Sequence, residues 1–525
     1  MPIAAESTTY GPFNMGVDYS RPAEDIPANG LHGMLNSRLT QSAAVEKVLG
    51  TKSYGQQSAI GGSPTLTACG EFRVPGGSEQ VFIVAGDTMY KYAGSGSGWA
   101  EIMPSSGVTI TAGDDNTFEW CRAFNTLILT NGVNPPIKWD GGASSDCATL
   151  DVDSRWTYAQ HVAFFDNRTW HANTNANRDR VWYSDIADPE TYGASSFYNL
   201  GSPVTALQPM QNALAIHTED FISVLIPTGN ASVPYQLQQR TTTDPRNPQH
   251  GGSISGRAVV TIPGNAQVFP MQDGIYMWNG GEQVEKISYA LDVYWDTIRK
   301  DRLHKSHAVY YADENEVWFW LPNDDTNCNQ IMVMSLKNRY QDRNTGQTQF
   351  AWYGPLNGAG STFERNCSAI IGDKPHAGSF SGKLLDHRPT DCYNHEDAAY
   401  DSFFETAAPP AMDGAMDLRW LYARTYYDGL GDYTLAIDQE SQGIGGSSGS
   451  ISTTGGGGLL GSFVLDNDVV GTIRMVSKDI DLSGYDPHSS LKFTNNQKDE
   501  TYRVRRTLLQ FKVIGRHRKP RAGVS

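Results

Sequence analysis

VWYSDIADPETYGASSFYNLGSPVTALQPMQNALAIHTEDFISVLIP, residues 181–227, consists of short apolar runs separated by turn residues. The run VWYSD ends in a turn that contains Asp185, Asp188 and Pro189. The runs ALAIH and FISVLIP follow, separated by Thr218–Asp220. Apolar runs that are interrupted about every 6 to 10 positions are typical of antiparallel β-structure rather than of helices. The stretch therefore predicts a strand, a long irregular loop and a tight hairpin.

The same pattern repeats on both sides of this stretch. Pairs of apolar runs separated by Gly, Asn or Asp recur as QVFIVAG with TMYKYAG, TLILTNG with PIKWDGG, AQVFPMQ with GIYMWNG, and HAVYYAD with EVWFWLP. Repeats of about 40 to 55 residues are typical of propeller blades of four strands. We therefore predict an all-β fold, a β-propeller of about six blades with a smaller C-terminal β-domain and an extended N-terminal arm.

Composition changes along the chain suggest three parts. Residues 1–75 are rich in Gly, Ser, Pro and Asn and predict a loop-rich arm, with a short helix through Ala43–Leu49. Residues 76–400 carry the propeller pattern. Residues 401–525 contain four longer strand patterns, LRWLYARTYY, YTLAIDQ, TIRMVSKDIDLSG and VRRTLLQFKVIG, and a glycine-rich loop at 443–462. This last part is a β-domain of its own or a continuation of the last blade.

The 525 residues are 39% hydrophobic and 19% charged, enough apolar content for a large core. No run of 18 apolar residues and no signal-like start occurs, so we expect no membrane insertion and assembly in a cytoplasm. The six cysteines show no C-x-x-C spacing, which predicts free thiols.

Charge is distributed unevenly around a net value of −16. Residues 501–525 hold eight basic and no acidic residues, so residues 1–500 carry 33 basic against 57 acidic, a difference of −24. An acidic body repels DNA, because the phosphate backbone is attracted by cations.

The opening stretch also resembles the tail nozzle or hub proteins of short-tailed bacteriophages, the packaged-DNA stabilisation type. The matching residues in the W..SD..DP..Y pattern are Trp182, Ser184, Asp185, Asp188, Pro189 and Tyr192. Further segments match in the same order, at 251–287 with DGIYMWNGG, at 317–322 with VWFWLP, and at 372–385. The resemblance covers roughly residues 115–390, and its signal is the order of the segments.

This resemblance implies a structural virion protein without enzymatic activity. Such a protein forms a homohexameric ring below the portal and the adaptor, or head-to-tail connector, and also contacts tail fibre or needle proteins. Genomic DNA is retained by the ring and passes through its channel without specific binding. The expected location is the virion tail, after assembly in the host cytoplasm, and the N-terminal arm would contact neighbouring subunits.

No cluster of residues indicates catalysis, a metal or a cofactor. The Gly455–Gly458 run lacks the Lys-Ser/Thr of a P-loop. His304 and His307 lack a third ligand. Trp318 and Trp320 alternate in a strand, where packing between blades is favoured over stacking on sugars. The alternative function is a host-surface-binding or carbohydrate-active propeller.

Two groups of charged residues are candidates for function in a DNA-conducting ring. A channel wall that lets DNA slide should be acidic, because each cation paired with a phosphate holds the duplex. Acidic pairs in hairpin turns are therefore candidates to face the channel: Asp114, Asp115, Asp313, Glu314, Asp324 and Asp325. The basic terminus is expected at an assembly interface, with Arg516, Arg518, Lys519 and Arg521 as its contacts.

Overall fold

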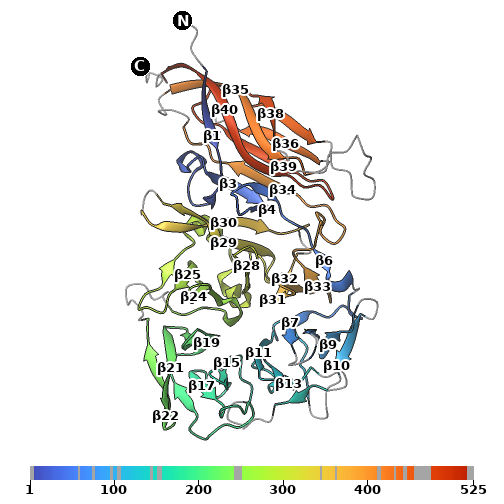
Figure 1. Ribbon diagram of the computed structural model, residues 1–525, viewed down its shortest axis with the longest axis vertical. Coiled ribbons are helices and arrows are strands. Elements are labelled where there is room, and N and C mark those ends of the chain that lie inside the picture. The colour runs from blue at the N-terminus through green and yellow to red at the C-terminus, as the bar shows by residue number, and fades with distance from the viewer. Residues whose placement is uncertain are drawn as a thin grey trace, which may run out of the picture. The chain divides into compact units, whose positions relative to one another are not determined.

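The computed structural model describes residues 5–56, 59–73, 77, 79–94, 98–102, 108–141, 146–150, 157–241, 251–342, 346–360, 363–410, 416–430, 433–440, 446–453 and 475–516 (Figure 1). The structure is all-β, with 53% of residues in strands and 5% in helices. The α-helix α1 (Asp292–Asp296) has five residues. The predicted all-β class is thereby confirmed.

The chain forms two compact units. Unit 1 contains residues 1–50, 332–360 and 390–525, and unit 2 contains residues 51–331 and 361–389. These bounds differ from the predicted parts 1–75, 76–400 and 401–525, because three separate chain segments pair into the sheets of unit 1.

Unit 2 contains a series of four-stranded antiparallel sheets, the first five of which have their strands in sequence order. Sheets of this kind have the pattern of propeller blades. The first three are β7 (Leu66–Arg73), β8 (Glu79–Ala85), β9 (Thr88–Tyr92) and β10 (Trp99–Ile102); β11 (Glu119–Ala123), β12 (Thr126–Thr130), β13 (Ile137–Trp139) and β14 (Ala148–Thr149); and β15 (His161–Phe165), β16 (Arg168–Ala172), β17 (Arg180–Tyr183) and β18 (Phe197–Asn199).

The remaining strands of unit 2 continue the series. Two further sheets are β19 (Val204–Pro209), β20 (Leu214–Thr218), β21 (Ile222–Asn230) and β22 (Val233–Gln239); and β23 (Val260–Ile262), β24 (Ala266–Met271), β25 (Gly274–Trp278) and β26 (Glu285–Lys286). The hairpin β27 (His307–Tyr311) and β28 (Glu316–Leu321) follows. The last sheet is β31 (Arg365–Ile371), β32 (Lys374–Ser379), β33 (Leu384–Asp386) and β6 (Lys52–Ser53).

The core of unit 2 consists of apolar layers between neighbouring sheets. One layer joins Phe82 and Trp139, and another joins Trp170 and Leu214. A further layer joins Leu66 of the first sheet to Leu384 of the last one. Alternating strand residues supply both faces of each sheet, because successive side chains point to opposite sides. Such layers join the first five sheets in series, and the last sheet to the first.

Unit 1 is built from two larger sheets. One has the order β38 (Met475–Asp481), β35 (Met416–Asp428), β40 (Arg503–Arg516), β5 (Val45–Lys47) and β4 (Ser37–Leu39), with β1 (Glu6–Tyr10) also on β40. The other runs through β29 (Gln330–Gln341), β30 (Thr348–Leu356), β2 (Gly16–Val17), β3 (Gly30–Leu35), β34 (Ser402–Thr406), β39 (Ser490–Asn495), β36 (Tyr433–Glu440) and β37 (Ser448–Thr453).

Several predictions for unit 1 need correction. The N-terminal segment is no extended arm, since β1 to β5 pair within the sheets of this unit and β6 pairs in unit 2. The helix predicted at Ala43–Leu49 is wrong, because Val45–Lys47 forms β5 against β4 and β40. Part of the predicted glycine-rich loop, Ser448–Thr453, is strand β37. Its residues 443–445 and 454–462 lie outside the described residues. The four longer strand patterns are confirmed as β35, β36, β38 and β40.

Candidate binding site in unit 2

A cavity of about 480 Å³ lies where the first strands of successive sheets in unit 2 begin. Figure 1 shows β7, β11, β15, β19 and β31 towards the middle of this unit, with β10, β13 and β22 farther out. The cavity is lined from the starts of β11, β15 and β19, from the 3-10 helix η3 (Gly256–Ala258) and from the residues just before β27. Volumes of about 300 to 1,000 Å³ are usual for small-molecule sites. Most of the residues that line it are polar or charged.

A hydrogen-bonded pair, Glu119 and His161, forms one wall. Nδ1–H of His161 donates to Oε1 of Glu119 at 3.0 Å, so Nε2 is the ring nitrogen that is left for another partner. His161 is only 2% exposed, and its Nε2 has no hydrogen-bond partner among the described residues. Gly256 lies against the pair, since a Cβ there would be 2.4 Å from Oε1 of Glu119. Only glycine fits at this position without displacing the pair.

Cations also line the cavity. Nζ of Lys305 lies 2.6 Å from Oδ1 of Asp115, and this ion pair lowers the pKa of the Asp115 carboxyl. The guanidinium of Arg257 donates to the backbone oxygens of Asn366, at 2.6 Å, and of Lys305, at 2.9 Å. Burial lowers the pKa of Arg257, because a charge deep in the unit is poorly solvated. Burial likewise lowers the pKa of His304, with Lys305 as a second cause.

A second cavity of about 200 Å³ shares residues with the first. Glu119, Gly256 and Arg257 line both cavities. The smaller one also reaches His307 and Cys367, in β27 and β31. Arg257 therefore lies between two hollow regions among the first strands of the sheets.

The structure separates the acidic residues that were predicted to face a channel. Asp114 and Asp115 line the larger cavity. Glu314, after β27, is paired with Arg388 at 3.1 Å, and Asp313 precedes it in the same turn. Asp324 and Asp325 lie in the loop after β28. The structure therefore does not bring the three pairs to one site, and their position in the channel of an assembled ring stays a prediction.

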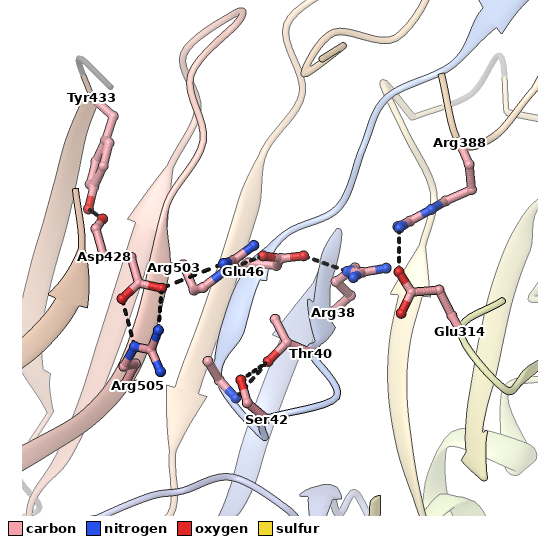
Figure 2. A network of polar contacts seen from close by, with 11 residues as sticks. Arg38, Thr40, Ser42, Glu46, Glu314, Arg388, Asp428, Tyr433, Arg503 and Arg505 are labelled. Carbon is pink, nitrogen blue, oxygen red and sulfur yellow. Dashed lines mark hydrogen bonds and ion pairs between the residues drawn. The ribbon is translucent and has the colours of Figure 1, made fainter. Parts of the chain in front are cut away.

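The basic terminus is partly folded into unit 1. Arg503, Arg505 and Arg506 lie in β40. Arg516 is the last residue of that strand, and Arg518, Lys519 and Arg521 lie outside the described residues. Part of the basic charge of residues 501–525 is paired with carboxylates of unit 1 itself. Figure 2 shows Glu46 between Arg38 and Arg503, and Asp428 between Arg503 and Arg505.

The W..SD..DP..Y residues form one hydrogen-bonded cluster in the third sheet. Trp182 is buried, and Oγ of Ser184 accepts the N–H of Thr169 at 3.0 Å. Hydroxyls of Tyr192 and Thr169 are 2.7 Å apart. Asp188 accepts the backbone N–H groups of Glu190 and Thr191, which closes the turn. These residues fix the loop after β17 and do not line either cavity.

Other residues singled out by sequence also have structural roles. Trp318 and Trp320 are both buried, which confirms packing over exposure for stacking. Nδ1 of His307 is 2.7 Å from Oγ of Ser368, whereas His304 lines the larger cavity. All six cysteines are free, as predicted. Within the described ranges, no group of three His, Cys, Asp or Glu side chains is placed to hold a metal ion.

Sequence reasoning missed the residues that define the cavity. Glu119, His161, Thr205 and Arg257 each lie at or just before the first strand of a sheet. A sequence signal was available, a polar residue immediately before each repeated apolar run. It becomes meaningful only when the sheets are known to bring these starts together.

No protein-family model and no curated protein matches this sequence. Among solved structures, the chain is similar to the computationally designed protein Ika8, at 14% identity and a TM-score of 0.37, over 63% of this chain and 98% of that one. It is also similar to the extracellular domain of the one-component system protein BT4673 from B. thetaiotaomicron, at 9% identity and a TM-score of 0.42, over 82% of this chain and 59% of that one. A third is PorZ, a bacterial surface component of the type-IX secretion system of Porphyromonas gingivalis, at 12% identity and a TM-score of 0.36, over 71% and 44% of the two chains. Likenesses this distant carry no argument about function.

None of the helices within the described ranges is long and apolar enough to cross a membrane.

Proposed function

We propose that this chain is a structural protein of a bacteriophage tail, a subunit of the ring-shaped nozzle or hub that retains the packaged genome and conducts DNA during ejection. The observation that carries the proposal is the ordered match of sequence segments to that family. Those segments fall on successive parts of one unit: the loop after β17, the hairpin β24–β25, strand β28, and the hairpin of β32 with β33. A shared order of structural segments is harder to obtain by chance than one motif.

The proposal includes a closed propeller of seven blades in unit 2, one more than the sequence pattern alone suggested. Six four-stranded sheets and the hairpin β27–β28 support this count. Its closure is supported by β31, which lies beside both β27 and β7. It is also supported by β6, a strand from before the first blade that forms the outer edge of the last. Pairing the first strand of unit 2 with its last strand in one blade closes such a propeller.

A ring of subunits needs surfaces for its neighbours and partners. We assign these contacts to the adaptor on one side and to the tail fibre or needle proteins on the other. The subunit is proposed to be one of six. Its acidic balance of −16 suits a wall along which DNA slides rather than binds.

Copy number in virions tests this proposal. Tails isolated from particles of the phage that encodes the chain should contain six copies, measured by native mass spectrometry and by reconstruction without imposed symmetry. Absence of the chain from tails, or a number other than six, would contradict the proposal. Turnover of host polysaccharide, measured as new reducing ends, would favour a carbohydrate-active propeller instead.

A further inference from the structure

Arg257 is a partly buried cation whose hydrogen-bond partners among the described residues are neutral, with the carboxylates of Glu119 and Asp115 nearby. Its guanidinium is held by two backbone oxygens, at 2.6 Å and 2.9 Å. None of the ion pairs among the described residues involves it, because Asp115 bonds Lys305 and Glu119 bonds His161. Burying a charge without a counter-ion is costly, and a guanidinium has five N–H groups to donate. The position is therefore one that an anion would stabilise.

Two side chains in the lining of the same cavity carry polar atoms suited to hydroxyl groups. Nε2 of His161 and Oγ1 of Thr205 are buried and have no hydrogen-bond partner in the part of the chain that the structure describes. Both residues line the cavity with Arg257. With Nδ1–H of His161 donating to Glu119, Nε2 accepts from a hydroxyl when the ring is neutral and donates to one when it is protonated, and the Thr205 hydroxyl both donates and accepts. Glu219 adds a carboxylate acceptor to the lining.

We propose that this cavity in unit 2 binds a small polyhydroxylated carboxylate, a sugar acid, with its carboxylate on Arg257 and its hydroxyls on His161 and Thr205. Among the described lining residues there is no Trp, Tyr or Phe, so a sugar ring has no aromatic face to stack on. The charge-assisted contact to Arg257 is then the main anchor. The volume of about 480 Å³ accommodates one or two sugar units. This site is separate from any role of the chain in a tail ring.

Calorimetric titration of the full chain with D-glucuronate tests the site. D-glucose, which lacks the carboxylate, and acetate, which lacks the hydroxyl groups, are the two control ligands. Glucuronate should bind saturably, and glucose and acetate each at least about tenfold more weakly, because each lacks one set of contacts. A uronate oligosaccharide is titrated in parallel. Tighter binding of the oligosaccharide identifies a polymer as the source of the ligand, and tighter binding of the monosaccharide identifies a free metabolite.

Two variants assign the contacts. Arg257→Gln should weaken glucuronate binding at least about tenfold, and Thr205→Val, which keeps the side-chain shape, about threefold. Arg299→Gln is the matched control, since Arg299 pairs with Asp301 outside the cavity. The melting temperature of each variant without ligand shows whether it is folded. If Arg257→Gln does not fold, the glucuronate affinity of Thr205→Val tests the proposal. Failure of glucuronate to bind, equal binding of acetate, or unchanged affinity in the folded variants would overturn the proposal. The copy number of the chain in tails is independent of all these results.

Discussion

His217 shows how a single polar side chain is buried in unit 2 without charge. It lies in β20 and is fully buried. The backbone N–H of Ser253 donates to its Nδ1 at 3.2 Å, and its Nε2–H donates to Oε1 of Gln267 at 2.8 Å. Both ring nitrogens are thus satisfied in the neutral form. Burial lowers the pKa of His217 from 6.5 to about 4.

This pKa shift makes the stability of the protein depend on pH. Between about pH 6.5 and pH 4 the unfolded chain binds a proton at His217 that the folded chain does not, so the free energy of unfolding falls as the pH falls through this window. The loss from this group is on the order of 2–3 kcal/mol. Urea unfolding at several pH values should show a smaller loss of unfolding free energy between pH 6.5 and pH 4 in His217→Gln than in the wild type, because the contribution of His217 is missing. Parallel pH curves for the two proteins would contradict the assignment.

At the scale of elements, the sheet of unit 1 is held by a row of alternating charges. Glu46 in β5 lies 2.6 Å from both Arg38 in β4 and Arg503 in β40. Asp428 in β35, fully buried, pairs with Arg505 at 2.6 Å and with Arg503 at 3.5 Å (Figure 2). Glu46 is shared by guanidiniums of the two strands beside it, and Asp428 by two guanidiniums of β40, so the row links four strands across the sheet.

Removing one charge from this row should be costly. Glu46→Gln keeps the side-chain shape and leaves Arg38 and Arg503 without their shared anion, which should lower the free energy of unfolding by about 3 kcal/mol. Asp479→Asn is the control, because its ion pair with Arg424 is exposed and joins two strands of the same sheet. The control should cost less than about 1 kcal/mol. Equal losses in chemical denaturation would show that burial of the row does not matter.

The short strand β6 is the element that joins the beginning and end of unit 2. Lys52 in β6 lies directly opposite Asp386 in β33 in the strand register. Directly opposed residues have Cβ atoms about 4.5–5.5 Å apart, close to the distance that a disulfide needs. Lys52→Cys with Asp386→Cys should therefore form a disulfide on mild oxidation, seen as a mobility shift on a non-reducing gel. Lys52→Cys with Asp373→Cys is the control, because Asp373 lies in the turn between β31 and β32. A disulfide in both pairs, or in neither, would argue against β6 as the closing strand.

Local signals in the sequence predicted the hairpins but not the long-range pairings. The turn residues around Gly86 correctly separate β8 from β9, because both strands and their turn are contiguous. Lys52–Ser53 has no apolar pattern of its own, and its partner β33 lies more than 300 residues away. Val45–Lys47 was mistaken for a helix for the same reason, since its strand form depends on β40. The cavity residues are brought together only by the arrangement of several sheets, so their position at strand starts could not be interpreted from the sequence alone.

At the scale of the whole molecule, the distribution of charge determines the affinity of the chain for DNA. The net charge is −16, although residues 501–525 carry eight basic residues. Arg503 and Arg505 of that segment are already paired with Glu46 and Asp428. Arg506 lies 4.6 Å from the ring centre of Tyr426. Fewer cations are thus available to phosphates than the sequence count suggests.

The isolated protein should therefore not bind duplex DNA at physiological salt. Each phosphate neutralised by a cation releases counter-ions and adds affinity, but a net negative body opposes the approach of the duplex. We expect fluorescence anisotropy with a labelled duplex to show no saturation below about 100 µM protein, the weak end of non-specific binding. Deleting residues 517–525 removes Arg518, Lys519 and Arg521 but keeps β40, and it should leave this result unchanged while weakening assembly into tails. Arg424→Gln is a matched control for loss of one exposed cation, since its pair with Asp479 lies away from the terminus. Measurable DNA binding that disappears with the deletion would make the terminus a nucleic-acid contact rather than an assembly contact.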